Sequence, residues 1–322
     1  MDKKYIFVFF ALFVALVLTS GCIGGTKTQQ VQKQTSFVGG TEGVKISLLP
    51  GQPPSQIFEV QPFLIGVQLE NKGEGNLTTV PPLPSNIYGY VSIAGIDFSR
   101  FNTTQSPKQS QEITRPLPPT TKIINSVVPG GQDQITFEVK APDIIGAQTQ
   151  YPLEVSVLYR YTSIATAAAC LKEDIYSQTV SGKEICKLVG TKPVESSGAP
   201  IKVTSIEELP TGFNIKIKNV GTGYPFKVDL TSVSASFPTT KSGIDQFSEK
   251  DRVAVTSVKL EEIDLTASCT PSELFLVNNE AQFFCRAELG KASAEAVKQL
   301  IITLDYGYVS SVSTTLNIQG TS

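Results

Sequence analysis

The chain has 322 residues, with 27 basic and 29 acidic side chains, a formal net charge of −2, five cysteines and no histidine. A slightly acidic surface argues against a nucleic-acid partner, because nucleic-acid binding needs a surface with clustered Lys and Arg. The absence of histidine excludes Ser-His-Asp and Cys-His catalysis, HExxH zinc sites and most other transition-metal centres. Carboxylate-pair and Ser-Lys hydrolases survive this test, but no motif favours them. We therefore expect a non-enzymatic protein with no cofactor and no bound metal.

The N-terminus has the pattern of a secretory signal. Lys3 and Lys4 precede fourteen consecutive apolar residues, Tyr5 to Leu18, which is fewer than the roughly 20 residues that a membrane-spanning helix needs. Small residues follow, as at a signal-peptide cleavage site. We predict a signal peptide over residues 1–21, in preference to a retained anchor helix.

The next residues resemble the lipobox of prokaryotic lipoproteins. The run Leu18-Thr19-Ser20-Gly21-Cys22 ends on a cysteine, and SGCIGG is similar to archaeal examples. The resemblance implies that Cys22 becomes the first residue of the mature chain and carries a lipid that holds it to the outer face of the cell membrane. Thr19 departs from the family pattern, which usually has an aliphatic residue there. An incidental cysteine in an ordinary signal peptide is the alternative.

The remaining cysteines form an even set. They are Cys170, Cys186, Cys269 and Cys285, which suits an oxidising compartment once Cys22 is set aside. We predict two local disulfides, Cys170–Cys186 closing a loop and Cys269–Cys285 crosslinking neighbouring strands. Metal-binding CxxC spacings are missing.

Residues 22–43 are polar and rich in Gly, Gln and Thr, and they are predicted to form a flexible tether. From Val44 onward, apolar and polar residues alternate between turns marked by Gly, Pro and Asn. This period of two predicts an all-β chain. Within it, Gly290 to Leu300 is the one stretch with the pattern of a short helix.

An internal repeat indicates the domain organisation. The block Asn71-Lys72-Gly73-Glu74-Gly75 recurs as Asn219-Val220-Gly221-Thr222-Gly223, in each case after alternating apolar residues, and the strands that end at Tyr161 and Tyr308 also match. We predict two tandem β-sandwich domains, 44–168 and 200–322, joined by a disulfide-closed loop and linker over 169–199.

The N-x-G-x-G block resembles that of CARDB-like and related immunoglobulin-like modules of archaeal and bacterial surface proteins. The resemblance covers both copies and implies immunoglobulin-like sandwiches on a cell surface. Asn and Gly tolerate the left-handed backbone of a tight turn, so we expect these residues to build a turn rather than bind a ligand.

Three surface features remain as candidates. Asn76 and Asn102 lie in N-glycosylation sequons. The polar, proline-containing segment from Ser99 to Thr121 is a candidate binding surface, with a stiff connection as the alternative. The tyrosine pairs on strands are either carbohydrate platforms or, as we expect, core residues; these are Tyr88/Tyr90, Tyr159/Tyr161 and Tyr306/Tyr308.

Together these features predict a lipid-anchored cell-surface protein with an adhesive, scaffolding or envelope-structural role. Its expected partners are the membrane, through the N-terminal lipid, and envelope or surface-layer proteins. The alternative is a substrate-capturing lipoprotein of a transport system, although such proteins usually have two α/β lobes and this chain lacks βα alternation.

Overall fold

The computed structural model describes residues 37–81, 86–101, 109–124, 126–173, 185–229 and 237–321. Over these residues the chain is built from β-strands joined by loops and turns, and its helical structure is limited to three 3₁₀ turns, Lys241–Gly243, Thr266–Ser268 and Leu289–Lys291. The predicted all-β fold class is confirmed. Residues 35–322 form one compact unit. None of the helical turns in the described ranges is long and apolar enough to cross a membrane.

The first repeat builds a three-stranded antiparallel sheet in the order β1-β3-β8. Its central strand shows why the alternating pattern forms a sandwich, because Ile65, Val67 and Leu69 are fully buried on one face. The strands of this part are β1 (Val44–Leu48), β2 (Ile57–Phe58), β3 (Pro62–Asn71), β4 (Gly89–Ala94), β5 (Ser110–Ile113), β6 (Thr121–Ile123), β7 (Ser126–Val128), β8 (Gln132–Lys140) and β9 (Gln148–Leu171).

The second repeat builds a five-stranded sheet in the order β10-β12-β13-β19-β17. Phe213, Ile215 and Ile217 of β13 are buried as their counterparts in β3 are. The strands are β10 (Gly190–Lys192), β11 (Val194–Ser196), β12 (Ile201–Leu209), β13 (Gly212–Asn219), β14 (Tyr224–Phe226), β15 (Arg252–Leu260), β16 (Ile263–Asp264), β17 (Cys269–Thr270), β18 (Glu273–Phe275), β19 (Glu280–Arg286) and β20 (Ala296–Gln319).

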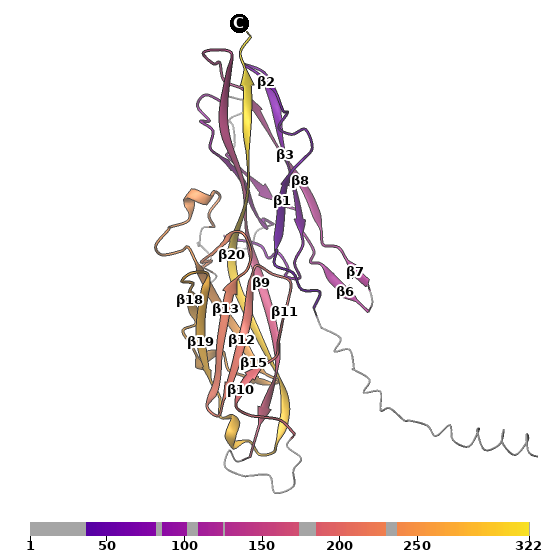
Figure 1. Ribbon diagram of the computed structural model, residues 1–322, viewed down its shortest axis with the longest axis vertical. Helices are drawn as coiled ribbons and strands as arrows, with labels where there is room; N and C mark the ends of the chain where they lie inside the picture. Colours follow the sequence, from indigo (N-terminus) through magenta and orange to yellow (C-terminus); the bar gives the residue numbers. More distant parts are fainter. Residues whose placement is uncertain are drawn as a thin grey trace, which may run out of the picture. The chain divides into compact units, whose positions relative to one another are not determined.

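A ten-stranded sheet runs through both repeats, with the path β16-β15-β20-β9-β4-β5. Its two central strands, β9 and β20, have 24 residues each and pair antiparallel from end to end, from Ala296 opposite Leu171 to Gln319 opposite Gln148. The first half of β9 pairs with β4 of its own repeat, and the first half of β20 pairs with β15 of its own repeat. The second half of each strand therefore extends into the other repeat, and Figure 1 shows both strands running through both halves.

The two repeats also share their interior. One continuous cluster of buried apolar side chains includes Ile65 and Val67 of the first repeat together with Ile215 and Ile217 of the second. The strand exchange explains this continuity, because each half of the ten-stranded sheet contains strands from both repeats. Removing one repeat would expose part of the core of the other.

Several predicted connections belong to the folded body. Residues 37–43, assigned to the tether from sequence, are attached to it, since Val38 and Gly39 both donate backbone N–H groups to Glu74. The segment 169–199, predicted as a loop and linker, contains β10, which pairs with β12, and β11, which pairs with β9. The stretch with helical pattern instead begins β20 at Ala296, after one 3₁₀ turn.

Candidate functional site

The repeated N-x-G-x-G block forms a hydrogen-bonded turn at the end of β3. The Asn71 side chain is fully buried and donates from Nδ2 to the carbonyls of Gly75 and Leu117, both at 3.0 Å. Its Oδ1 accepts from the Gly73 N–H at 3.2 Å and from the Tyr161 hydroxyl at 3.0 Å. The Tyr161 oxygen in turn accepts from the Gly75 N–H at 3.0 Å. All the polar groups of the asparagine side chain are satisfied inside the protein, so the turn is a structural element.

The second repeat reproduces this arrangement at the end of β13. Asn219 donates to the Gly223 carbonyl at 2.8 Å and accepts from the Gly221 N–H at 3.2 Å and from the Tyr308 hydroxyl at 3.0 Å. The Tyr308 oxygen accepts from the Gly223 N–H at 3.0 Å. The two turns are therefore structural counterparts, which is how the repeat appears in three dimensions.

Four tyrosines lie together near the middle of the β9–β20 ladder, where each strand passes from one repeat into the other. We call this region the crossing. Tyr161 lies opposite Tyr306, and Tyr159 lies opposite Tyr308, with neighbouring ring centroids 5.6 to 6.4 Å apart. All four side chains are almost fully buried. Burial raises the pKa of each phenol above its usual value, so none ionises near neutral pH. They are core residues, and these four cannot form a carbohydrate platform.

An ion pair reinforces the same crossing. Arg160 on β9 donates from Nε and Nη2 to the two carboxylate oxygens of Asp305 on β20, at 3.0 and 2.8 Å. Both side chains are largely buried. A bidentate pair of this kind has a fixed geometry, so it holds the register of the two exchanged strands.

A pocket of about 110 Å³ opens beside this crossing. Its walls come from the entry to β1, from the Gly221–Thr222 turn of the second repeat, and from β20. The lining residues are Thr41, Glu42, Gly43, Val44, Lys45, Ile46, Pro200, Gly221, Thr222, Tyr308, Ser310 and Ser311. We call this the junction pocket.

The counterpart of the junction pocket on the first repeat's turn is filled. Glu74 stands there where Thr222 stands in the second repeat, and its carboxylate accepts from the N–H groups of Val38, Gly39 and Gly198 at 2.7, 2.9 and 2.6 Å. The neighbouring edge of β9 is covered by β11, which pairs with Ala165 to Ala167. On β20, the described strands β14 and β2 pair at residues 307–309 and 318–319, and none of the described strands pairs with the stretch between them on that side.

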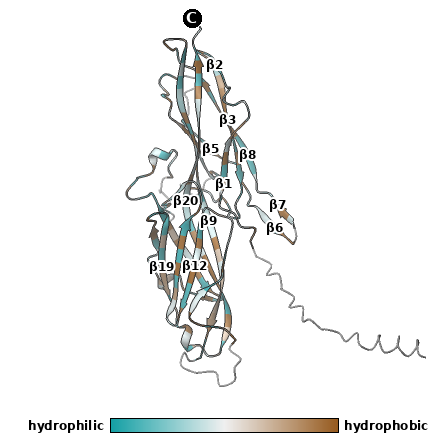
Figure 2. Cartoon of the chain, viewed as in Figure 1, coloured by the Kyte–Doolittle hydropathy of each residue, from teal (hydrophilic) through white to brown (hydrophobic). Residues whose placement is uncertain are grey.

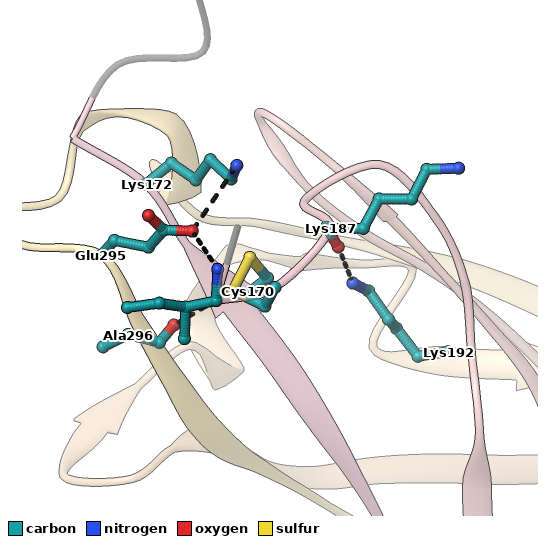
Figure 3. Close-up of polar contacts among 8 residues, drawn as sticks. Cys170, Lys172, Lys187, Lys192, Glu295 and Ala296 are labelled. Atoms are coloured by element: carbon teal, nitrogen blue, oxygen red, sulfur yellow. Dashed lines mark hydrogen bonds and ion pairs between the residues drawn. A yellow bond between two sulfur atoms is a disulfide. The ribbon is translucent and has the colours of Figure 1, made fainter. Parts of the chain in front are cut away.

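Both predicted disulfides are present. Cys269 and Cys285 lie directly opposite each other on β17 and β19, as expected for a link between neighbouring strands. Cys170, at the end of β9, is bonded to Cys186. Figure 3 shows that this link is held to the start of β20, where Glu295 pairs with Lys172 at 3.6 Å and accepts from the Ile185 N–H at 3.3 Å.

A buried carboxylate lies behind the Cys170–Cys186 link. Glu208 is fully buried, accepts from the Cys170 N–H at 2.7 Å and pairs with Lys192 at 2.5 Å. Burial raises the pKa of Glu208, and the lysine opposes that shift. Because both carboxylate oxygens have a partner, this group is a structural link between β9, β10 and β12 rather than an exposed acid.

The other predicted site residues fall in different places. Asn76 is exposed, directly after the first turn, whereas Leu77 and the Thr78 hydroxyl of the same sequon are buried. Cys22 and Asn102 lie outside the described residues. Within the described ranges, no group of three or more His, Cys, Asp or Glu side chains is arranged to hold a metal ion.

Two described parts of the proline-containing candidate surface belong to the folded body. Part of the segment forms β5, and Leu117 is 1% exposed with its carbonyl bonded to Asn71. Leu117 is therefore packed against the first turn, while Arg115, Pro116 and Pro118 are exposed. Sequence reasoning did not indicate the importance of Glu74 or the junction pocket, although the Glu-to-Thr difference between the two repeat blocks was the available signal.

Comparisons with known proteins do not assign the chain to a family. No family model matches it, and no curated protein matches it. Among solved structures, the chain is weakly similar to Escherichia coli alpha-2-macroglobulin activated by porcine elastase, with 8% identity and a TM-score of 0.13 over 86% of this chain and 32% of that chain. The chain thus spans about a third of the length of that protein, and the similarity is too low to support an argument.

Proposed function

We propose that the protein is a non-enzymatic, lipid-anchored scaffold on the outer face of a cell membrane, which holds an envelope or surface-layer protein through the junction pocket. The apolar N-terminus and the lipobox-like run ending at Cys22 support the anchor. The two disulfides support an oxidising location. No ligand chemistry is needed for this role.

The observation that carries the scaffolding role is the 24-residue ladder between β9 and β20. Proteins that capture a substrate by closure move two lobes about a hinge of a few residues. Here the two repeats are joined instead by a continuous sheet, a buried tyrosine cluster and the Arg160–Asp305 pair. A rigid junction suits presentation of a partner better than closure around a solute.

The size of the junction pocket points the same way. Small-molecule sites usually have about 300–1,000 Å³, and this pocket has about 110 Å³. Its filled counterpart holds two residues of backbone, Val38 and Gly39, through their N–H groups. We therefore infer that the occupant of the pocket is a short extended segment of a protein partner.

The repeat provides a matched pair of positions for the test. Gly43 and Pro200 accept equivalent backbone bonds from Lys72 and Val220, which makes Lys45 of the open side the counterpart of Lys202 on the filled side. A photo-crosslinking amino acid at each position, in cells that carry the full chain, would be followed by mass spectrometry. We expect position 45 to capture an envelope protein and position 202 to capture none.

Two results would overturn the proposal. Equal crosslinking at positions 45 and 202, or none at 45 together with a small molecule bound to the purified protein, would favour the solute-capturing alternative. The anchor is tested separately by the mass of the N-terminal peptide. A mature chain that lacks lipid on Cys22, or a Cys22→Ala variant that remains in the membrane fraction, would contradict it.

A further inference from the structure

We propose that the β6–β7 hairpin is a second membrane contact, which places an aliphatic tip in the interface of the bilayer. We define the hairpin tip as Ile123, Ile124, Val127 and Val128. The proposal rests on the proposed lipid anchor, because the anchor brings the hairpin to the membrane surface. It assigns a lipid surface, and not a protein, as the occupant of this patch.

The hairpin tip exposes apolar side chains that no described part of the protein covers. The exposed fractions are 53% for Ile123, 76% for Ile124, 52% for Val127 and 43% for Val128. Strands β6 and β7 pair with each other in a separate two-stranded sheet, outside the paths of the other sheets. Figure 2 shows hydrophobic colour at this hairpin. Neither packing into the core nor pairing in a larger sheet accounts for these exposed apolar side chains. Contact with an apolar partner would account for them.

The backbone at Ile124 supports the same conclusion. Its φ is 49°, in the left-handed region that β-branched residues rarely adopt. Asn or Gly would fit this turn position at lower cost. An exposed isoleucine in a conformation that disfavours it is explained neither by packing nor by local backbone preference, and a role in contacting lipid accounts for both.

The charges around the hairpin suit a membrane surface. Residues 113–132 contain no Asp or Glu and two basic residues, Arg115 and Lys122. The Arg115 side chain is 72% exposed, at 3.7 Å from Asp133. Lys122 lies in β6 next to the tip residue Ile123, and a basic residue beside an apolar tip favours anionic lipid headgroups. The tip also lacks the Tyr, Trp and Arg side chains that usually dominate protein–protein contacts.

The hairpin starts from the same turn that holds the incoming chain. Thr120, directly before β6, donates its N–H to the Gly73 carbonyl at 2.8 Å and its hydroxyl to the Asn71 carbonyl at 3.2 Å. Glu74 of that turn binds Val38 and Gly39. The 14 residues 23–36 would span roughly 20 Å as a random coil. A lipid on Cys22 therefore keeps the base of the hairpin close to the bilayer.

A second contact would add to the membrane affinity of a lipid anchor. A single acyl chain binds a membrane only marginally, and stable attachment takes two signals. The hairpin tip supplies an apolar contact, and the base of the hairpin is bonded to the same turn that holds Val38 and Gly39. The two contacts together would hold the first turn close to the membrane surface.

The test uses the full, lipid-bearing protein in vesicles of neutral and anionic lipid. Ser126→Cys, exposed between the tip residues, would carry an environment-sensitive dye, and Phe247→Cys, at an exposed side chain in another loop, is the control. We expect lipid-borne quenchers to quench the dye at 126 and not at 247. A dye at 126 that remains unquenched on vesicles while Cys22 carries its lipid overturns the hairpin proposal and leaves the anchor standing.

A second variant separates structure from lipid contact. Ile124→Asn suits the left-handed backbone, so the melting temperature should be unchanged or higher, while the partition of the tip into lipid should fall about tenfold because apolar surface is lost. Unchanged quenching in this variant would contradict the proposal. Quenching that appears only when an envelope protein is added would also contradict it, since the occupant would then be protein. An unlipidated Cys22 with the dye still quenched would contradict the anchor alone.

Discussion

The two N-x-G-x-G turns differ at one functional position. Both hold their asparagine with a tyrosine hydroxyl and two glycine backbones. The first turn adds Glu74, whose carboxylate binds three backbone N–H groups. The second has Thr222, and a pocket remains open beside it. The same kind of turn can thus close one side of the junction between the repeats, through Glu74, and leave a pocket open on the other side.

The asparagines themselves should give the largest effects. Asn71→Ala removes four hydrogen bonds from a fully buried site, and we expect the free energy of unfolding to fall by about 3 kcal/mol. Asn219→Ala removes three comparable hydrogen bonds. Its fourth, to Asn279 Oδ1, is longer at 3.5 Å and only partly buried, so we expect a fall of about 2 kcal/mol. Chemical denaturation would measure both. Two separate unfolding transitions, with each variant shifting its own, would show that the repeats do not share one cooperative core.

The tyrosine hydroxyls should matter less, and equally. Tyr161→Phe and Tyr308→Phe each remove one donor to an asparagine and one acceptor for a glycine N–H. We expect each to lower the free energy of unfolding by about 1–2 kcal/mol. A difference of more than about 1 kcal/mol between them would mean that the two turns are not energetic counterparts.

Replacing Glu74, the residue that differs between the two turns, should change local hydrogen exchange more than the global free energy of unfolding. In Glu74→Thr, the amides of Val38, Gly39 and Gly198 lose their acceptor, so their hydrogen exchange should become much faster, while the global stability falls by about 1 kcal/mol. Thr222→Ala, on the open side, should change stability by less than about 0.5 kcal/mol. Protected amides at Val38 and Gly39 in Glu74→Thr would show that other contacts hold this segment.

The smallest effect is a pH response at the far end of the first repeat. Glu59 accepts from the Thr321 N–H and hydroxyl and from the Ile144 N–H, and these hydrogen bonds lower its pKa to about 2. A carboxylate whose pKa is lowered on folding contributes stability above its unfolded pKa and loses it as the pH falls through the folded value. We expect the Thr321 amide to exchange faster, relative to its intrinsic rate, as the pH drops from about 4.5 towards 2. Glu59→Gln should remove this pH dependence.

Short-range features explain how much the sequence could predict. The alternation in β3 and β13 indicates strands with one buried face, because side chains alternate between the faces of a strand. The spacing of Cys269 and Cys285 predicts a link between neighbouring strands, and that link is present. The repeat at Asn71 and Asn219 predicts two equivalent turns, and both are present. Glycine is required in them because the Tyr161 and Tyr308 rings approach the glycine backbones too closely for a Cβ atom to fit.

Longer-range features were decided by tertiary structure alone. A strand pattern states which face of β9 is buried but not which strand lies beside it, so the exchange of β9 and β20 between repeats had no local signal. The same holds for Glu74, whose role depends on Val38 and Gly198 arriving from distant parts of the chain. By itself the sequence determined the strands, the turns and the disulfide pairs, since these follow from residue type and spacing. Tertiary structure decided the shared core, the open pocket and the exposed hairpin tip, since these depend on which segments meet in space.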